Sequence, residues 1–340
     1  MGIKVGLIGA GSIAQGHLNT LQANRDVDEI YIADTSDIAR QNAQKNFPKV
    51  KKVFVDYREM LKDESIRMAD VCTPHYLHHQ IVFDSLKAGK DVLVEKPIAM
   101  TLKEADHMIN TARKLGRRLF VEMNQRFMPY HIEAKKLIEN GAIGRPFLAV
   151  FNIMGNTFDT MNNPNHWKGS WEKAGGGAMI DTGYHAIYMM LHFLGKPKAV
   201  TGVAKRLLVQ PENKADDNTV AILEFDNKIL GTIAISYTIF SEAWMEMRHI
   251  YGTEGSLHIK DEPLEPLILV KENRSQVIET GQPKDIHPHP YSLKCAVDYY
   301  IDCIISGRES EVTLEEARDT LAVALAIYES SRKGKRITLW

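Results

Sequence analysis

The sequence predicts an α/β protein in which an N-terminal, doubly wound parallel sheet is followed by an α+β domain with a large, mostly antiparallel sheet. Two observations carry this prediction. Up to about residue 122, short apolar runs alternate with helical stretches, which is typical of a parallel sheet with helices on both faces. From residue 123 on, apolar runs follow one another with few helices between them, which favours antiparallel strands. We therefore expect two domains, residues 1–122 and residues 123–340.

The totals of the chain agree with two domains and bear on its partners. The 340 residues are about twice the ~150 residues of a typical domain. With 44% hydrophobic residues, 25% charged residues and a formal net charge of −1, nothing attracts the protein to nucleic acid or to a membrane surface. Three cysteines without paired spacing indicate buried thiols in a reducing compartment. The chain starts directly with a strand pattern and has no targeting segment, so we expect a cytoplasmic protein.

The first apolar run, residues 3–8, leads straight into a glycine turn and a helical stretch. The turn has the spacing G-x-G-x-x-A, formed by Gly9, Gly11 and Ala14. In this pattern the first glycine makes the tight turn, the second lets the backbone approach a pyrophosphate, and the third, small residue packs helix against strand. We therefore expect a dinucleotide-binding Rossmann domain, with Gly9, Gly11, Ser12 and Ile13 at the cofactor. A glycine turn with a purely structural role is the alternative.

The second strand, residues 29–33, ends at Asp34, 25 residues after Gly9. A carboxylate at this place accepts hydrogen bonds from the ribose diol of the adenosine and repels a 2′-phosphate. Asp34 therefore favours NAD over NADP as the cofactor. NADP stays open because Arg40 is close in sequence, and Asp34 as a turn or capping residue is the structural alternative.

Polar residues follow two further expected strands, residues 69–72 and 91–94. Since ligands bind outside the carboxyl ends of parallel strands, both following loops should face the crevice of the glycine turn. Lys96 in Glu95-Lys96-Pro97 is held there by the proline, and its ammonium group is a candidate proton donor or carbonyl polariser. A surface salt bridge between Lys96 and Glu95 is the alternative.

The second domain is predicted from its strand-like runs. Helices are expected at residues 129–140, 289–306 and 313–333, the last from a capping box of Thr313 and Glu316. The expected strands are 147–154, 200–209, 219–225, 230–238, 247–251, 256–259 and 267–271.

Within this domain, three consecutive glycines, Gly175-Gly-Gly177, precede an apolar segment that we predict to be helical. Asp181 and His185 lie four residues apart in it, so on a helix both side chains share one face. Such a carboxylate and imidazole can form a general acid/base pair. The alternative is that Asp181 caps the helix and His185 is an interior histidine.

Taken in order, these motifs resemble those of the Gfo/Idh/MocA oxidoreductase family over nearly the whole chain. The resemblance rests on Gly9-Ala-Gly11, Thr73-Pro74, Glu95-Lys96-Pro97, Gln125-Arg126-Phe127, Gly175-Gly-Gly177 and Asp181-Thr-Gly-Tyr-His185. It implies a Rossmann domain and a second domain whose open sheet forms a homodimer or homotetramer interface.

The resemblance also implies roles for single residues. The catalytic set is Lys96, Asp181 and His185, which also bind the substrate, a small sugar or polyol. Trp167, within the segment His166-Trp167-Lys168, is expected in the substrate pocket together with Tyr184. The residues expected on the cofactor side are Thr73, Pro74, His78, Glu95, Lys96 and Gln125. One departure concerns Tyr188, because members of the inositol dehydrogenase type commonly carry an aspartate there. The substrate therefore stays open.

The expected function is NAD(P)-dependent hydride transfer between the nicotinamide and a secondary alcohol of a sugar, sugar derivative or cyclitol. One alternative cleaves glycosides by transient oxidation and elimination, with Tyr184 and Tyr188 as additional acid/base groups. Another is a dinucleotide-sensing protein without chemistry. We also considered a metal site at His185 and His192, but their spacing matches no compact metal-binding motif, and we predict no metal.

Overall fold

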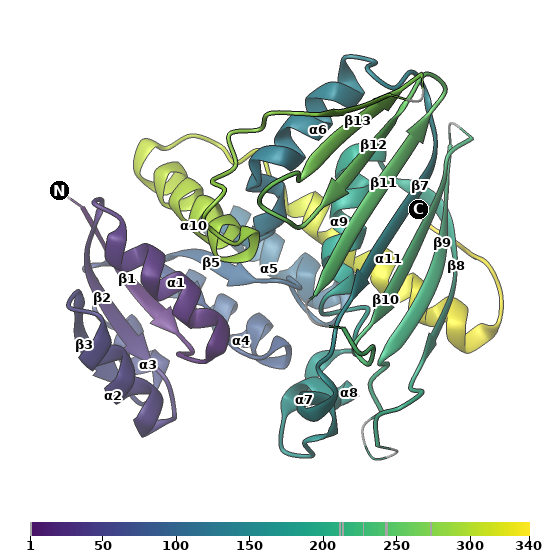
Figure 1. Cartoon of the computed structure of the whole chain (residues 1–340). Helices are drawn as coiled ribbons and strands as arrows, with labels where there is room; N and C mark the ends of the chain where they lie inside the picture. The colour runs from purple at the N-terminus through teal and green to yellow at the C-terminus, as the bar shows by residue number, and fades with distance from the viewer. Residues whose placement is uncertain (1, 211, 213, 227, 242–243, 273) are drawn as a thin grey trace. The chain divides into compact units, whose positions relative to one another are not determined.

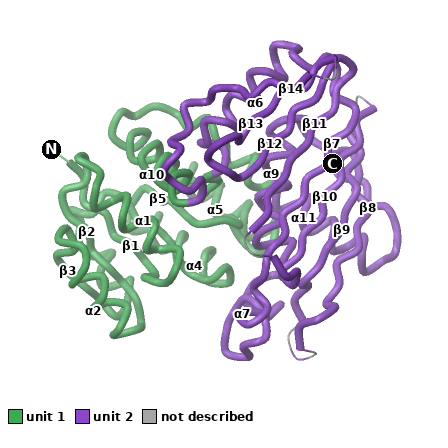
Figure 2. Tube along the Cα trace, in the orientation of Figure 1, with its two compact units in different colours: residues 1–124, 290–318 green, residues 125–289, 319–340 purple. Residues whose placement is uncertain are grey.

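The computed structural model describes residues 2–210, 212, 214–226, 228–241, 244–272 and 274–340 (Figure 1). The chain forms two compact units, shown in different colours in Figure 2. Unit 1 consists of Met1–Asn124 and Pro290–Arg318, and unit 2 of Gln125–His289 and Asp319–Trp340.

Unit 1 is built on a parallel sheet of six strands in the order β3-β2-β1-β4-β5-β6. The strands are β1 (Ile3–Ile8), β2 (Val27–Ala33), β3 (Val50–Phe54), β4 (Ile66–Val71), β5 (Asp91–Glu95) and β6 (Leu119–Glu122). The strand order reverses between β1 and β4, which is where doubly wound sheets bind ligands. The predicted Rossmann sheet is confirmed.

Helices alternate with these strands along the chain. They are α1 (Ser12–Ala23), α2 (Asp37–Asn46), α3 (Tyr57–Leu61), α4 (His75–Lys87) and α5 (Leu102–Leu115). Thr101 and Glu104 form a reciprocal capping box before α5, and Gly116 ends that helix in the left-handed conformation. The side chains of α5 that face the sheet are buried, among them Met108 and Ile109.

A late segment of the chain completes unit 1. Most of α10 (Pro288–Ser306) packs there: the Tyr300 hydroxyl donates to the Val121 carbonyl at 2.8 Å, and the Tyr300 and Phe120 rings lie 5.1 Å apart. The sequence-based division after residue 122 assigned this segment to the second domain. Periodicity shows that α10 has an apolar face but not which surface that face covers.

Unit 2 contains a sheet of nine strands in the order β14-β13-β12-β11-β7-β10-β9-β8-β15. Its strands are β7 (Pro146–Met154), β8 (Pro197–Lys205), β9 (Asn218–Phe225), β10 (Leu230–Ser236), β11 (Met245–Gly252), β12 (Ser256–Lys260), β13 (Leu267–Lys271), β14 (Arg274–Val277) and β15 (Ile337–Thr338). Of the pairs in this sheet, β7 and β10 run parallel and the others antiparallel, as predicted.

The other elements of unit 2 lie between or after these strands. They are η1 (Asn124–Phe127, whose first residue belongs to unit 1), α6 (Pro129–Glu139), α7 (Phe158–Asn162), η2 (Trp167–Gly169), α8 (Trp171–Ala174), α9 (Gly183–Leu194) and most of α11 (Leu314–Lys333). Helix α9 is buried along most of its length and packs against β7 and β10.

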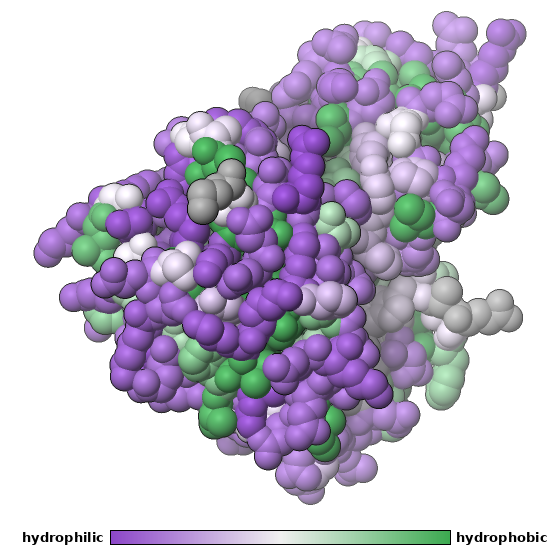
Figure 3. Space-filling model, turned by 90° about the vertical axis from the view of Figure 1, so that its left-hand side faces the viewer, coloured by the Kyte–Doolittle hydropathy of each residue, from purple (hydrophilic) through white to green (hydrophobic). Residues whose placement is uncertain are grey.

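The surface of the protein is mixed in character. On the face shown in Figure 3, hydrophilic residues dominate and hydrophobic residues occur in small groups. No helix in the described part of the chain has both the length and the apolar character needed to cross a membrane.

Candidate active site

The predicted site residues fall on both units, which are described in turn. In unit 1, the glycine turn after β1 has the geometry that its spacing predicts. Gly9 has a φ of +90°, and a Cβ there would lie 2.6 Å from the Cys72 carbonyl oxygen. At Gly11, by contrast, a Cβ would meet no atom within 4 Å. Gly11 precedes α1 without a side-chain cap, so the backbone around Ser12 and Ile13 is open to an anion at the helix N-terminus.

Asp34 lies against this turn. Its Oδ2 accepts the Ala10 N–H at 2.7 Å, and its Oδ1 accepts the Ser36 N–H at 2.7 Å. The side chain that caps α2 is Ser36, so Asp34 does not cap that helix, but its contact with the N–H two residues on is that of a turn residue. Arg40 donates to the Asp34 carbonyl and to the Asp37 carboxylate, so the nearest cation already has acidic and carbonyl partners within the protein.

The loops after β4 and β5 are tied together by His78. Its buried ring places Nδ1 2.8 Å from the Pro97 carbonyl oxygen and Nε2 2.9 Å from the Thr73 carbonyl oxygen. Burial lowers the pKa of His78, so its neutral ring donates to one of these two carbonyl oxygens at a time. Pro74 directly precedes α4. His78 thus joins the segment around Thr73 and Pro74 to the turn that carries Lys96.

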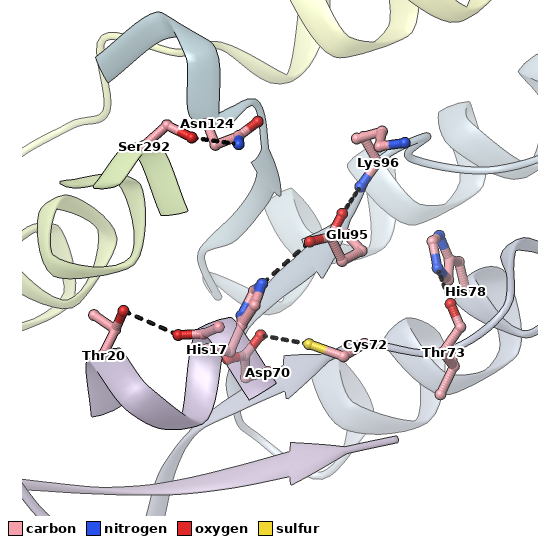
Figure 4. Close-up of polar contacts among 11 residues, drawn as sticks. His17, Thr20, Asp70, Cys72, Thr73, His78, Glu95, Lys96, Asn124 and Ser292 are labelled. Carbon is pink, nitrogen blue, oxygen red and sulfur yellow. Dashed lines mark hydrogen bonds and ion pairs between the residues drawn. The ribbon is translucent and has the colours of Figure 1, made fainter. Parts of the chain in front are cut away.

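Glu95 points into unit 1 and not along the surface (Figure 4). Its Oε1 lies 3.1 Å from His17 Nε2, and its Oε2 accepts the backbone N–H of Lys96 at 3.1 Å. Only 6% of Glu95 is exposed, whereas Lys96 is half-buried. The Glu95 carboxylate is therefore buried, and its two oxygens contact the His17 ring and the Lys96 backbone.

In unit 2, helix α9 begins later than the sequence suggests. Its first residue is Gly183 and its N-cap residue is Thr182, so Asp181 lies in the preceding turn and neither shares the helix with His185 nor caps it. Both sequence interpretations of Asp181 were wrong on this point. Before the helix starts, the chain makes a tight turn through residues 178–182.

Asp181 is held by a cation and a phenol. Its Oδ2 accepts hydrogen bonds from Lys168 Nζ and from the Tyr237 hydroxyl, both at 2.7 Å, and Asp181 is 7% exposed. Burial and the negative charge of Asp181 raise the pKa of Tyr237 well above its usual value, so the phenol stays a donor. Lys168 lies over the Trp167 ring, with 5.7 Å between Nζ and the ring centroid. The structure thus brings the predicted Trp167 segment beside Asp181.

His185 is positioned by Tyr188, one turn further along α9. The Tyr188 hydroxyl lies 2.8 Å from His185 Nδ1 and accepts the Gln125 backbone N–H at 3.2 Å. Tyr188 is buried, whereas His185 is half-buried. When the phenol donates to Nδ1, a neutral His185 carries its proton on Nε2. Spacing of i and i+3 on a helix could have revealed this pair from the sequence.

The remaining predicted residues of unit 2 are buried. Tyr184 is 0% exposed. The Gln125 amide is held on both sides: its Nε2 donates to Glu246 at 2.9 Å, and Arg248 Nη2 donates to its Oε1 at 2.5 Å. The role of Tyr184 at the substrate and the role of Gln125 at the cofactor stay predictions.

The glycine loop before Asp181 is anchored by Asp216. The buried Asp216 carboxylate accepts the N–H groups of Gly177 and Met179 and the hydroxyls of Thr219 and Tyr328. Burial raises the pKa of Asp216, and these hydrogen bonds oppose the rise. A Cβ at Gly177 would lie 1.9 Å from the Asp216 carbonyl oxygen, so the close approach that the glycines allow is to the protein itself. No sequence signal pointed to Asp216.

We expect Gly177→Ala to destabilise the protein by about 2–4 kcal/mol, because the added methyl group must displace the Asp216 backbone. Thermal unfolding measures this as a loss of several degrees in Tm. Gly116→Ala is the matched control: a Cβ there meets no atom within 4 Å, and only the left-handed backbone adds a cost of about 1 kcal/mol. Equal losses for both variants would contradict the role of Asp216.

The alternative of a metal site at His185 and His192 can be compared with the structure. Within the described residues, the group of His, Cys, Asp and Glu side chains close enough to share an ion is His17, Asp70 and Cys72, which excludes His185 and His192. Burial lowers the pKa of His192 to about 3, so its ring is neutral.

Comparison with known proteins agrees with this geometry. Residues 3–123 match the GFO/IDH/MocA family model described as "Oxidoreductase family, NAD-binding Rossmann fold". Residues 135–339 match the model described as "Oxidoreductase family, C-terminal alpha/beta domain". The resemblance inferred from the motifs is confirmed, and so is a Rossmann domain of the NAD-binding kind.

Individual relatives are more distant. The chain is 27% identical over 259 residues to the uncharacterized oxidoreductase YrbE of Bacillus subtilis (strain 168), covering 75% of this chain and 72% of that protein. It is 28% identical over 236 residues to a myo-inositol 2-dehydrogenase of Thermotoga maritima, covering 68% and 67%. A levoglucosan dehydrogenase, solved in complex with NADH and levoglucosan, shares the fold with a TM-score of 0.90 at 23% identity, over 99% of both chains.

Proposed function

Because the chain belongs to the GFO/IDH/MocA oxidoreductase family, we propose that it oxidises a secondary alcohol of a sugar, sugar derivative or cyclitol, with Lys96, Asp181 and His185 as the catalytic residues. The protein is an NAD-binding oxidoreductase, and the nicotinamide supplies the hydride acceptor. The observation that carries the proposal is the contact of His185 Nδ1 with the Tyr188 hydroxyl at 2.8 Å, because it fixes the orientation of a half-buried imidazole.

In the proposed mechanism, the neutral His185 ring carries its own proton on Nδ1 and accepts the proton of the substrate hydroxyl at Nε2. The Tyr188 hydroxyl holds the ring at Nδ1 during this proton transfer. Lys96 donates a hydrogen bond to the substrate oxygen and stabilises the negative charge that develops there. Asp181 stabilises the imidazolium by its charge and keeps Lys168 near the substrate hydroxyls. The segment around Trp167 and Tyr184 then contributes to the substrate pocket.

A substrate screen tests the proposal. Purified protein with NAD is offered inositols, aldoses, anhydrosugars and glycosides, and NADH formation is recorded together with the products. Net NADH formation with a ketone product supports the proposed reaction. Release of an aglycone without net NADH would instead support transient oxidation followed by elimination.

The structure of the unit 1 turn supports NAD over NADP. The residues that would hold the adenosine end are Gly9, Gly11, Ser12, Ile13 and Asp34, and the open space at Gly11 fits a pyrophosphate. The Asp34 carboxylate has both oxygens fixed by backbone N–H groups and keeps lone pairs for a ribose diol.

We expect Asp34→Ala to weaken NAD binding by about tenfold, because the substitution removes the acceptor of the ribose diol. It should also reduce the ratio of NAD affinity to NADP affinity, because the carboxylate no longer repels a 2′-phosphate. Fluorescence titration with NADH and NADPH measures both affinities. The exposed Asp26, replaced by Asn, is the matched control and should leave both unchanged. An unchanged ratio of the two affinities in Asp34→Ala would remove Asp34 from the cofactor site.

We also propose a homodimer or homotetramer formed through the sheet of unit 2. Several outward positions of its strands are apolar: Val203, Val220, Ile222 and Leu230 are 54%, 58%, 44% and 50% exposed. One-sided sheets normally carry polar residues on the solvent face, and apolar patches of this kind mark interfaces. Light scattering after gel filtration measures the mass in solution, and a monomer at micromolar concentration would contradict the proposal.

We place the enzyme in the cytoplasm. All three cysteines are free thiols, and burial raises the pKa values of Cys72, Cys295 and Cys303. Free thiols are typical of a reducing compartment.

A further inference from the structure

Unit 1 contains a buried group of titratable side chains that the proposed mechanism does not use. His17 comes from α1, Asp70 from β4 and Glu122 from β6, and each is at most 1% exposed. Cys72 follows β4, and Glu95 ends β5. Burying so many ionisable groups together is costly unless they are paired. Their arrangement therefore needs a physical account.

His17 bridges two carboxylates. Its Nδ1 lies 2.9 Å from Asp70 Oδ2, and its Nε2 lies 3.1 Å from Glu95 Oε1. An ionised carboxylate only accepts hydrogen bonds, so both ring nitrogens of His17 must donate. The ring is then an imidazolium and offers no lone pair to a metal ion. The cluster of His17, Asp70 and Cys72 is thus a hydrogen-bonded network.

The surroundings of His17 favour its charged form. Burial opposes the charge, but the carboxylate of Asp70 outweighs it and raises the pKa of His17 well above its usual value. Burial likewise disfavours the Glu95 carboxylate, but the hydrogen bond from His17 and the nearby Lys96 lower the pKa of Glu95. Cys72 donates to Asp70 at a sulfur–oxygen distance of 3.7 Å, and burial keeps it a neutral thiol.

Glu122 adds no third anion to the two carboxylates that His17 bridges. It pairs with Glu95 in the register of β5 and β6, and neither of its oxygens has a hydrogen-bond partner in the described part of the chain. Burial and the carboxylates of Glu95 and Asp70 raise the pKa of Glu122 well above its usual value, so it stays protonated. His17 is consequently the cation that permits Glu95 to be ionised in this interior.

The network ends at Lys96. Figure 4 shows the chain of contacts from His17 through Glu95 to Lys96. While one Glu95 oxygen is fixed by His17, the other accepts the Lys96 backbone N–H at 3.1 Å. We propose that His17 is a positioning residue for the reaction: through Glu95 it fixes the turn that carries the Lys96 ammonium group. This inference rests on the proposed role of Lys96.

The first experiment measures the state of His17 directly. In the intact protein, nitrogen-15 NMR of the histidine rings, assigned by through-bond correlations to the His17 backbone, should show both ring nitrogens of His17 protonated at pH 8. An unprotonated ring nitrogen on His17 at that pH would overturn the bridge. This measurement uses the unmodified protein, so it holds even if the variants fold poorly.

The second experiment is a double-mutant cycle of His17→Gln and Glu95→Gln. We expect His17→Gln to lower kcat about 100-fold, because misplacing a catalytic group by an ångström has that effect, while Kd for NADH changes less than about threefold. In the Glu95→Gln background, the same substitution should lower kcat less than about threefold, since the path to Lys96 is already broken. Equal losses in both backgrounds, or a parallel loss of NADH binding, would show a merely structural role.

A matched control and a distinguishing variant complete the design. His79→Gln changes a histidine of α4 outside the network and should leave kcat unchanged. If Lys96→Ala keeps full turnover, the proposed function fails whatever His17→Gln does. If Lys96→Ala is inactive while His17→Gln keeps the kcat of the unmodified protein, only the inference about His17 fails.

Discussion

Replacement of Lys96 by alanine is expected to lower kcat by about 10³-fold while the Kd for NADH changes less than about threefold. The ammonium group is assigned to the charge that develops on the substrate oxygen, and such stabilisation is stronger in the transition state than in the ground state. The turn that carries Lys96 is fixed by the backbone contact with Glu95 and by the hydrogen bond between His78 and Pro97. The substitution removes a side chain from this turn and leaves both contacts in place.

Steady-state kinetics on a substrate found in the screen, together with fluorescence titration of NADH, measure this effect. Lys87→Ala is the matched control, because Lys87 is an exposed lysine at the end of α4 in the same unit. It should leave kcat and cofactor binding unchanged. Full turnover in Lys96→Ala would remove Lys96 from the mechanism.

The second large effect is expected at His185. His185→Ala should lower kcat by 10²- to 10⁴-fold, roughly the contribution of a positioned general acid/base, with NADH binding preserved. The ordinary pKa of a histidine side chain is about 6.5, so this type of residue can accept and release a proton near neutral pH. In the unmodified protein, Tyr188 fixes the ring at Nδ1, so the effect should come from the loss of proton transfer and not from a disordered pocket.

Two further measurements separate these causes. Added imidazole should partly restore turnover in His185→Ala, because a small base can enter the space left by the side chain. His192→Ala, on the same helix, should keep kcat near that of the unmodified protein, since burial already holds the His192 ring neutral. Unimpaired turnover in His185→Ala, or an equal loss in His192→Ala, would argue against His185 as the acid/base group.

Local sequence signals predicted much of the fold. The glycine turn at Gly9 and Gly11, the position of Asp34 after β2, and the capping box of Thr313 and Glu316 all act within a few residues or one strand–helix unit. These features form as predicted because they depend on the backbone geometry and the apolar periodicity of neighbouring residues. The helix start at Gly183 was missed because the turn that precedes it carries the same apolar residues as the helix.

The sequence by itself determined the parallel and antiparallel sheets, the dinucleotide turn and the family, because periodicity and motif spacing are properties of neighbouring residues. Only the tertiary structure decided which groups hold the site residues. Tyr237 reaches Asp181 across 56 positions, Asp216 reaches Gly177 across 39, and His17 reaches Glu95 across 78. It also placed Pro290–Arg318 in unit 1. These contacts arise from packing elements that are distant in sequence, and no local pattern encodes which buried donor meets which acceptor.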